Sequence, residues 1–147
     1  MAVKTINLTF DGYWREINKD GIPKKSGVYL TYSCKYNPPT KEGERGTVDL
    51  TKLIYIGEAE DANDRIATHD KWDDWRKQVP KGEEICFSFA EVASPDRERA
   101  ECALIYYHKP VCCDKSTETF DYDETTIISS GCCKFIKSPI TVKRTNT

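Results

Sequence analysis

Three stretches of the chain alternate apolar and polar side chains in the way expected of β-strands, namely residues 27–33, 53–57 and 84–92. A period of two places Tyr29 and Tyr55 on the faces opposite to the more apolar side chains of their strands. A polar loop rich in proline and glycine, residues 37–46, separates the first two strands and predicts a hairpin. We therefore expect the two tyrosines to share one face of an antiparallel sheet.

Helical patterns follow the second strand. Asp61 is a suitable N-cap for a helix that begins at Ala62 and carries Arg65 and His69, four residues apart, on one face. A second short helix is expected over residues 71–78. Because the first helix starts directly after the strand that holds Tyr55, we expect Arg65 and His69 to lie near that tyrosine.

A longer helix is predicted after the third strand, from the Ser-Pro-Asp start signal at residues 94–96 to Tyr107 or His108. Its buried stripe is expected to include Leu104 and Tyr107. Glu101 lies to the side of that stripe, so its carboxylate is expected at the rim of the core, where it needs a partner.

The predicted elements describe one α+β domain over residues 1–147. Its expected core, residues 26–114, is a small three-stranded antiparallel sheet flanked by helices. Residues 115–147 form a C-terminal extension, with extra strands expected at 125–128 and 140–143. An edge strand is also consistent with the pattern over residues 3–10.

Charge and hydropathy restrict the function classes. The formal net charge is -2, from 22 Lys and Arg against 24 Asp and Glu, so the chain lacks the broad basic surface typical of nucleic-acid binding. A nucleic-acid partner would therefore need a local site. The sequence contains no apolar run of about 18 residues and no signal-peptide pattern, which predicts no membrane partner and a cytoplasmic location.

The seven cysteines are odd in number, and four of them form the adjacent pairs Cys112-Cys113 and Cys132-Cys133. This spacing is not that of a small disulfide-stapled domain, so we expect reduced thiols. Adjacent cysteines are also poorly placed to chelate one tetrahedral zinc ion. A metal-binding interaction module built on these pairs is therefore kept only as a third hypothesis.

The order of the motifs then becomes informative. Gly-Val-Tyr at residues 27–29, Tyr-Ile-Gly at residues 55–57, the pair Arg65 and His69, and Glu101 in the next long helix together resemble the GIY-YIG nuclease family over residues 26–114. The Arg-x-x-x-His spacing is closer to its restriction-endonuclease branch. Each motif is weak by itself, but their joint occurrence in this order is fairly specific.

The resemblance implies a divalent-metal-dependent endonuclease that hydrolyses DNA phosphodiester bonds. Tyr29 would activate the attacking water, with Tyr55 beside it, and Arg65 would face the phosphate. His69 would form hydrogen bonds near the tyrosines and the water, and Glu101 would be the single protein ligand of one Mg²⁺ or Mn²⁺ ion.

One position departs from the family pattern, because Cys113 stands where the family has asparagine after a Lys-Pro pair. The alternative function is therefore a non-catalytic member that binds nucleic acid or protein. Sequence specificity and oligomeric state have no signal in the sequence.

Each residue also has an ordinary structural explanation. Both tyrosines fit half-buried strand positions, and Arg65 with His69 fits a solvated helix face. Glu101 could form an ion pair with Arg97, one helical turn earlier. Gly27 and Gly57 are expected to serve as turn residues.

Overall fold

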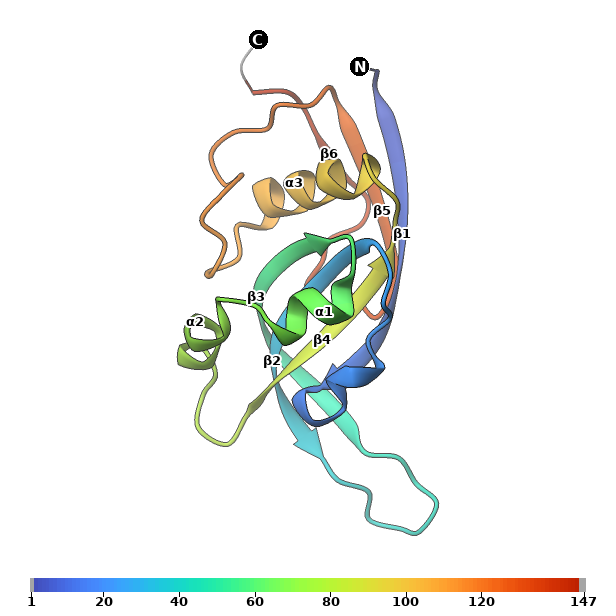
Figure 1. Cartoon of the computed structure of the whole chain (residues 1–147), viewed down its shortest axis with the longest axis vertical. Helices are drawn as coiled ribbons and strands as arrows, with labels where there is room; N and C mark the ends of the chain where they lie inside the picture. Colours follow the sequence, from blue (N-terminus) through green and yellow to red (C-terminus); the bar gives the residue numbers. More distant parts are fainter. Residues whose placement is uncertain (1, 146–147) are drawn as a thin grey trace.

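The computed structural model describes residues 2–145, which form one sheet with a few short helices (Figure 1). In chain order the elements are β1 (Lys4–Arg15), the 3-10 helix η1 (Glu16–Gly21), β2 (Gly27–Asn37), β3 (Thr47–Ala59), α1 (Ala62–Ala67), α2 (Trp72–Lys77), β4 (Glu84–Glu91), α3 (Asp96–His108), β5 (Thr125–Gly131) and β6 (Ile140–Val142).

All six strands belong to one curled, half-barrel sheet with the order β3-β2-β4-β1-β5-β6. Four of the neighbouring pairs are antiparallel, whereas β1 and β5 run parallel, so the sheet is mixed. Figure 1 shows the loop between β2 and β3 projecting away from the rest of the molecule. This order leaves β3 as a sheet edge.

The predicted architecture, a small three-stranded antiparallel sheet flanked by helices, is wrong. The three predicted strands do pair with one another as β3-β2-β4, but β1 adds to β4 and then carries β5 and β6. The physical reason is long-range pairing: β1 offers Ile6, Leu8 and Phe10 to the core, and these side chains are buried only once β1 joins the sheet.

The alternation of side chains divides the interior between the two faces of the sheet. Val28, Leu30 and Tyr32 of β2 pack with the apolar face of α3 in one cluster. Tyr29, also on β2, lies in a second cluster with Ile66 of α1 and with Trp75 of α2. Tyr29 therefore lies on the face of the sheet opposite to that of Val28, Leu30 and Tyr32, as expected from the sequence.

Regular alternation fails in β3, where the register with β2 shifts between Thr31 and Tyr32. Tyr55 pairs with Thr31 but Leu53 pairs with Tyr32, which leaves Ile54 as an extra residue. Ile54 consequently joins Tyr55 in the second cluster, while Ile56 belongs to the first. A strict period of two, which would place Ile54 and Ile56 together on the face opposite Tyr55, therefore holds for Tyr55 and Ile56 and fails at Ile54.

Two helix predictions also need correction. α1 starts where Asp61 predicts, because the Asp61 carboxylate accepts a hydrogen bond from the amide of Asp64 at 3.0 Å. The helix ends at Ala67, so His69 lies in the following segment and not on the same helix as Arg65. In α3, Tyr107 is exposed, contrary to the predicted buried stripe, and Glu101 is buried instead.

Candidate functional site

Two stacked tyrosines form the base of the site. Tyr29 pairs with Gly57 across the β2 and β3 strands, which makes Tyr55 its diagonal neighbour on the same face. The ring centroids of Tyr29 and Tyr55 are 6.1 Å apart, and the ring planes differ by 30°. Both tyrosines are buried, and Tyr29 is 1% exposed.

Gly57 provides the space for this arrangement. A Cβ atom at Gly57 would lie 2.3 Å from Cζ of Tyr29 and 2.4 Å from its hydroxyl oxygen. The glycine is inside β3, not in a turn, and so its expected role as a turn residue is wrong. Glycine is needed at position 57 because any side chain there would collide with the phenol ring of Tyr29. Gly27 is confined in the same way by Phe89 and Ala90.

His69 lies beside both tyrosines and against Trp75. Its ring centroid is 5.2 Å from that of Tyr55, 6.3 Å from that of Tyr29 and 4.6 Å from that of Trp75. Burial, assisted by the positive charge of Arg65, lowers the pKa of His69 to about 4, so the imidazole is neutral at physiological pH. The 3.4 Å approach of Nδ1 to the Asp70 carboxylate is consequently no ion pair under these conditions.

The hydrogen bonding of His69 fixes its tautomer. Nδ1 accepts a hydrogen bond from the backbone amide of Lys71 at 3.0 Å, so the proton of the neutral ring is on Nε2. Nε2 is buried and has no hydrogen-bond partner among residues 2–145. An unsatisfied buried donor costs about 1–3 kcal/mol, so this N–H would gain stability by donating to an oxygen of a ligand or water.

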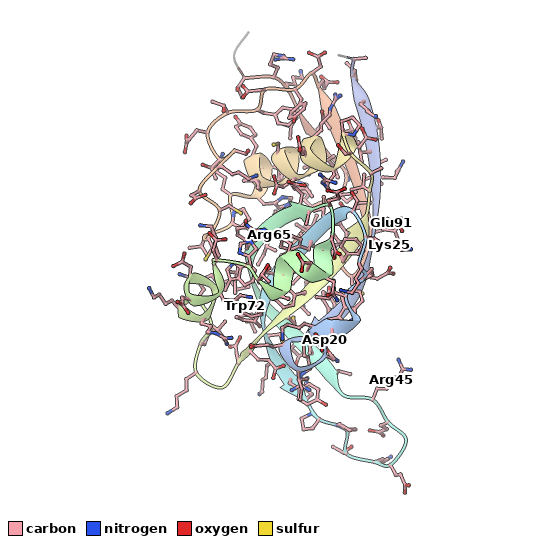
Figure 2. The ribbon with its side chains drawn as sticks, in the orientation of Figure 1. Asp20, Lys25, Arg45, Arg65, Trp72 and Glu91 are labelled. Carbon is pink, nitrogen blue, oxygen red and sulfur yellow. The ribbon has the colours of Figure 1, made fainter. Side chains whose placement is uncertain are left out.

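Arg65 supplies an exposed cation next to these rings. It extends from α1, its side chain is 44% exposed, and its guanidinium lies 3.3 Å from the exposed carboxylate of Asp70. Figure 2 shows Arg65 beside α1 in the region between that helix and α3. Since an exposed ion pair of this kind is weak, the guanidinium is available to an incoming anion.

These groups meet at a cavity of about 230 Å³ located at the β3 edge of the sheet. Its walls come from β3, α1, the residues after α1, α3 and the segment after α3. The lining residues are Tyr55, Arg65, His69, Asp70, Lys71, Ile105, Cys113, Asp114 and Lys115. Tyr29 and Glu101, the other two predicted site residues, lie behind this wall, Tyr29 stacked on Tyr55 and Glu101 bound to Lys115.

Glu101 is a buried carboxylate with a cation already bound to it. Nζ of Lys115 is 3.0 Å from Oε1 of Glu101, whose side chain is only 3% exposed. The suggested partner, Arg97, instead bonds to Glu58 and to the hydroxyl of Ser26. The prediction that Glu101 lies at the rim of the core is therefore wrong about its depth, although it does have the partner that a buried carboxylate requires.

The electrostatic environment of Glu101 suits a cation. Burial raises its pKa, the positive charge of Lys115 lowers it, and the nearby carboxylate of Glu58 raises it. A carboxylate is the kind of hard oxygen ligand that Mg²⁺ and Mn²⁺ prefer. Among residues 2–145 there is no group of three or more His, Cys, Asp or Glu side chains that could hold a metal, so Glu101 would be a minimal ligand.

Both tyrosines are neutral phenols in this state. Burial raises the pKa of Tyr29 and of Tyr55 above the ordinary value, and Arg65 offsets only part of that effect. A phenol that keeps its proton can orient a water molecule by hydrogen bonding. Full removal of a tyrosine proton would need additional positive charge close to the ring.

Cys113, the departure from the family pattern, lies along the edge of β3. Its sulfur is 3.4 Å from both the backbone nitrogen and the backbone oxygen of Ile56, and the amide of Cys112 donates to the carbonyl of Ile54 at 3.0 Å. The thiol thus contacts polar backbone groups that would otherwise be unpaired at a sheet edge, directly beside Tyr55. This gives Cys113 a positioning role.

The cysteine-based metal hypothesis has no support within the described residues. All seven cysteines are free thiols, as the expectation of reduced cysteines requires. Neither adjacent pair belongs to a metal-ligating group in the part of the chain that the structure describes.

Sequence reasoning missed Lys115, which covers Glu101, and Lys71, whose amide fixes the His69 tautomer. Nothing in the local pattern marks either lysine, because each reaches the site through a loop. Both could be found only from the spatial proximity of their loops to β3 and α3.

Comparison of the chain with family models, curated proteins and solved structures gave no significant match. Over the described residues, no helix is both long enough and apolar enough to cross a membrane.

Proposed function

We propose that this protein is a divalent-metal-dependent endonuclease that hydrolyses phosphodiester bonds of DNA. The observation that carries the proposal is one small cavity lined by Tyr55, Arg65 and His69. Tyr29 stacks on Tyr55 behind its wall, and Glu101 is paired with the lining residue Lys115. The order of these residues, which resembles that of the GIY-YIG nucleases, supports the same reaction class.

Hydrolysis of a phosphodiester needs neutralisation of the phosphoryl charge, an oriented water and help for the leaving oxygen. Arg65 is an exposed cation on the cavity wall and is suited to bind the phosphate oxygens in a bidentate way. A metal ion held by Glu101 would supply the remaining positive charge.

The water is oriented by Tyr55 and His69. Nε2–H of His69 is an unpartnered buried donor, and the His69 ring lies 5.2 Å from that of Tyr55, centroid to centroid. Tyr29 keeps Tyr55 in position by stacking and, with positive charge nearby, is the group we assign to proton acceptance.

A non-catalytic DNA-binding protein is the alternative, because the raised pKa values of both tyrosines oppose proton acceptance in the metal-free state. We also propose a cytoplasmic location, which the free thiols at all seven cysteines support.

The test compares two arginines that are alike in structure. Arg65 and Arg76 both extend from short helices, are 44% and 53% exposed, and pair with one carboxylate each. With supercoiled plasmid and Mg²⁺ or Mn²⁺, we expect cleavage by the parent protein, a loss of about 10²-fold in Arg65→Met, and little change in Arg76→Met.

Equal cleavage by Arg65→Met and the parent would contradict the assignment. Absence of metal-dependent cleavage, combined with a DNA gel shift that Arg65→Met weakens, would favour the non-catalytic alternative.

A further inference from the structure

We propose that Lys115 and a divalent cation are alternative partners of Glu101, so that metal entry moves the Lys115 ammonium from the carboxylate into the cavity. The proposal deepens the proposed function and rests on its metal site at Glu101. It assigns to Lys115 a role in controlling access to that site.

The two partners differ greatly in freedom. The side chain of Glu101 is 3% exposed and belongs to the interior face of α3, whereas that of Lys115 is 59% exposed and extends from the loop after α3. The lysine can turn away into solvent at little cost in packing, but the carboxylate cannot follow it. A cation that binds Glu101 must therefore exchange with the ammonium in place.

The position of Lys115 in the cavity wall also indicates that a metal ion must displace it to reach Glu101. Lys115 is part of the cavity wall together with Tyr55, Arg65 and His69, whereas Glu101 is not. The ammonium thus separates the carboxylate from the cavity. A metal ion arriving through the cavity meets Lys115 before it can reach an oxygen of Glu101.

Electrostatics makes the two cations mutually exclusive at close range. A magnesium ion would lie about 2.1 Å from its carboxylate oxygen. An ammonium held 3.0 Å from the same carboxylate would then repel the ion across a short distance. One bound cation already offsets the single negative charge of Glu101.

The displaced ammonium would be free to bind a phosphate group in the cavity. Once released, it joins Arg65 on the wall that would face a phosphate group. Metal and DNA would then strengthen each other's binding, because the metal frees a cation for the phosphate and the phosphate retains that cation away from Glu101.

The test measures Mn²⁺ affinity without DNA, from the electron paramagnetic resonance signal of free Mn²⁺. Removing the competing ammonium in Lys115→Met should lower the dissociation constant by about fivefold. Lys71→Met is the matched control, because Lys71 also lines the cavity and pairs with a different carboxylate, Asp114. It reports the general effect of removing one positive charge.

Two further variants define the competition. Lys115→Arg, which keeps the charge, should bind Mn²⁺ no more tightly than the parent, and Glu101→Gln should lose the site. The proposal would be overturned if Mn²⁺ affinity rises no more in Lys115→Met than in Lys71→Met. It would also be overturned if Glu101→Gln still binds Mn²⁺.

A second readout uses the unmodified chain. Acetylation of lysines by a mild reagent, followed by peptide mass spectrometry, should show faster labelling of Lys115 when Mn²⁺ is added, while Lys71 stays unchanged. Unchanged labelling of Lys115 at saturating Mn²⁺ would contradict its release.

Neither measurement depends on cleavage, so the two proposals fail separately. A protein that exchanges Lys115 for Mn²⁺ but does not cut DNA contradicts only the nuclease. A protein that cuts DNA, with equal Mn²⁺ affinity in Lys115→Met and Lys71→Met, contradicts only the exchange.

Discussion

Helix α3 carries two buried charges, Arg99 and Glu101, that are satisfied in opposite ways. Nε of Arg99 donates to the hydroxyl of Thr125 at 2.7 Å, and Nη2 donates to the carbonyls of Ala2, Asp123 and Glu124 at 2.8, 3.1 and 3.3 Å. Glu101, by contrast, is paired with the largely exposed Lys115.

The difference separates a structural charge from one suited to function. Arg99 is bound by oxygens of the strand β5 and of the segments next to β1 and β5. Its charge therefore joins α3 to the part of the sheet that lies beyond the three strands of the predicted core. Glu101 is paired instead with a lysine that lines the cavity at the β3 edge and is 59% exposed. Under the proposed exchange, a buried charge can bind a ligand if its present partner is an exposed side chain that can move away, even when the charge itself is deeply buried.

The largest expected effect is the loss of the Arg99 contacts. Arg99→Met would leave several oxygens of the chain without their donor, and we expect the free energy of unfolding to fall by about 4 kcal/mol. Urea denaturation measures this change. Arg76→Met, which removes an exposed guanidinium, should cost less than about 1 kcal/mol. Similar losses in the two variants would mean that Arg99 does not hold the sheet to α3.

The next effect concerns the packing that supports the site at the β3 edge. Gly57→Ala would place a methyl group against the Tyr29 ring, so we expect a loss of about 2–3 kcal/mol and a displaced phenol. Gly43→Ala is a useful control, because a Cβ atom there meets nothing within 4 Å, although its φ of 85° adds some backbone strain. Near-ultraviolet circular dichroism should report the altered tyrosine packing in Gly57→Ala only.

A smaller effect is the dependence of stability on pH through His69. Its folded pKa of about 4 lies below its ordinary value of 6.5, so the unfolded chain takes up the proton first as the pH falls. The contribution of neutral His69 is complete above about pH 6.5, and about 2 kcal/mol of it is lost as the pH falls toward 4.

His108 also has a lowered pKa, so its titration overlaps with that of His69. The difference between parent and His69→Gln unfolding curves isolates the His69 part. A difference that is independent of pH across this interval would show that His69 is not held neutral by the fold.

The smallest effect on stability is expected for Glu101→Gln. This change removes a buried negative charge and leaves Lys115 free to enter solvent, so we expect the protein to become about 1 kcal/mol more stable. If Glu101 binds the metal as proposed, the same variant loses metal-dependent cleavage. Destabilisation comparable to that of Arg99→Met would place Glu101 among the structural charges and remove the contrast between them.

Sequence patterns predicted the positions of several site residues better than they predicted the complete strand order of the sheet. Tyr29 and Tyr55 are diagonal neighbours in adjacent strands, and Asp61 caps the helix that carries Arg65, so local alternation and capping predicted these placements. The place of β1 between β4 and β5 depends on pairing between segments far apart in the chain, which no local pattern encodes.

The sequence by itself determined the strands that hold the tyrosines and the start of α1. Only the tertiary structure decided that β1, β5 and β6 complete one curled sheet, that Gly57 leaves room for the Tyr29 ring, and that Lys115 covers Glu101. The physical reason is the range of the forces involved: periodicity and capping act over a few residues, whereas burial and ion pairing depend on which distant segments the fold brings into contact.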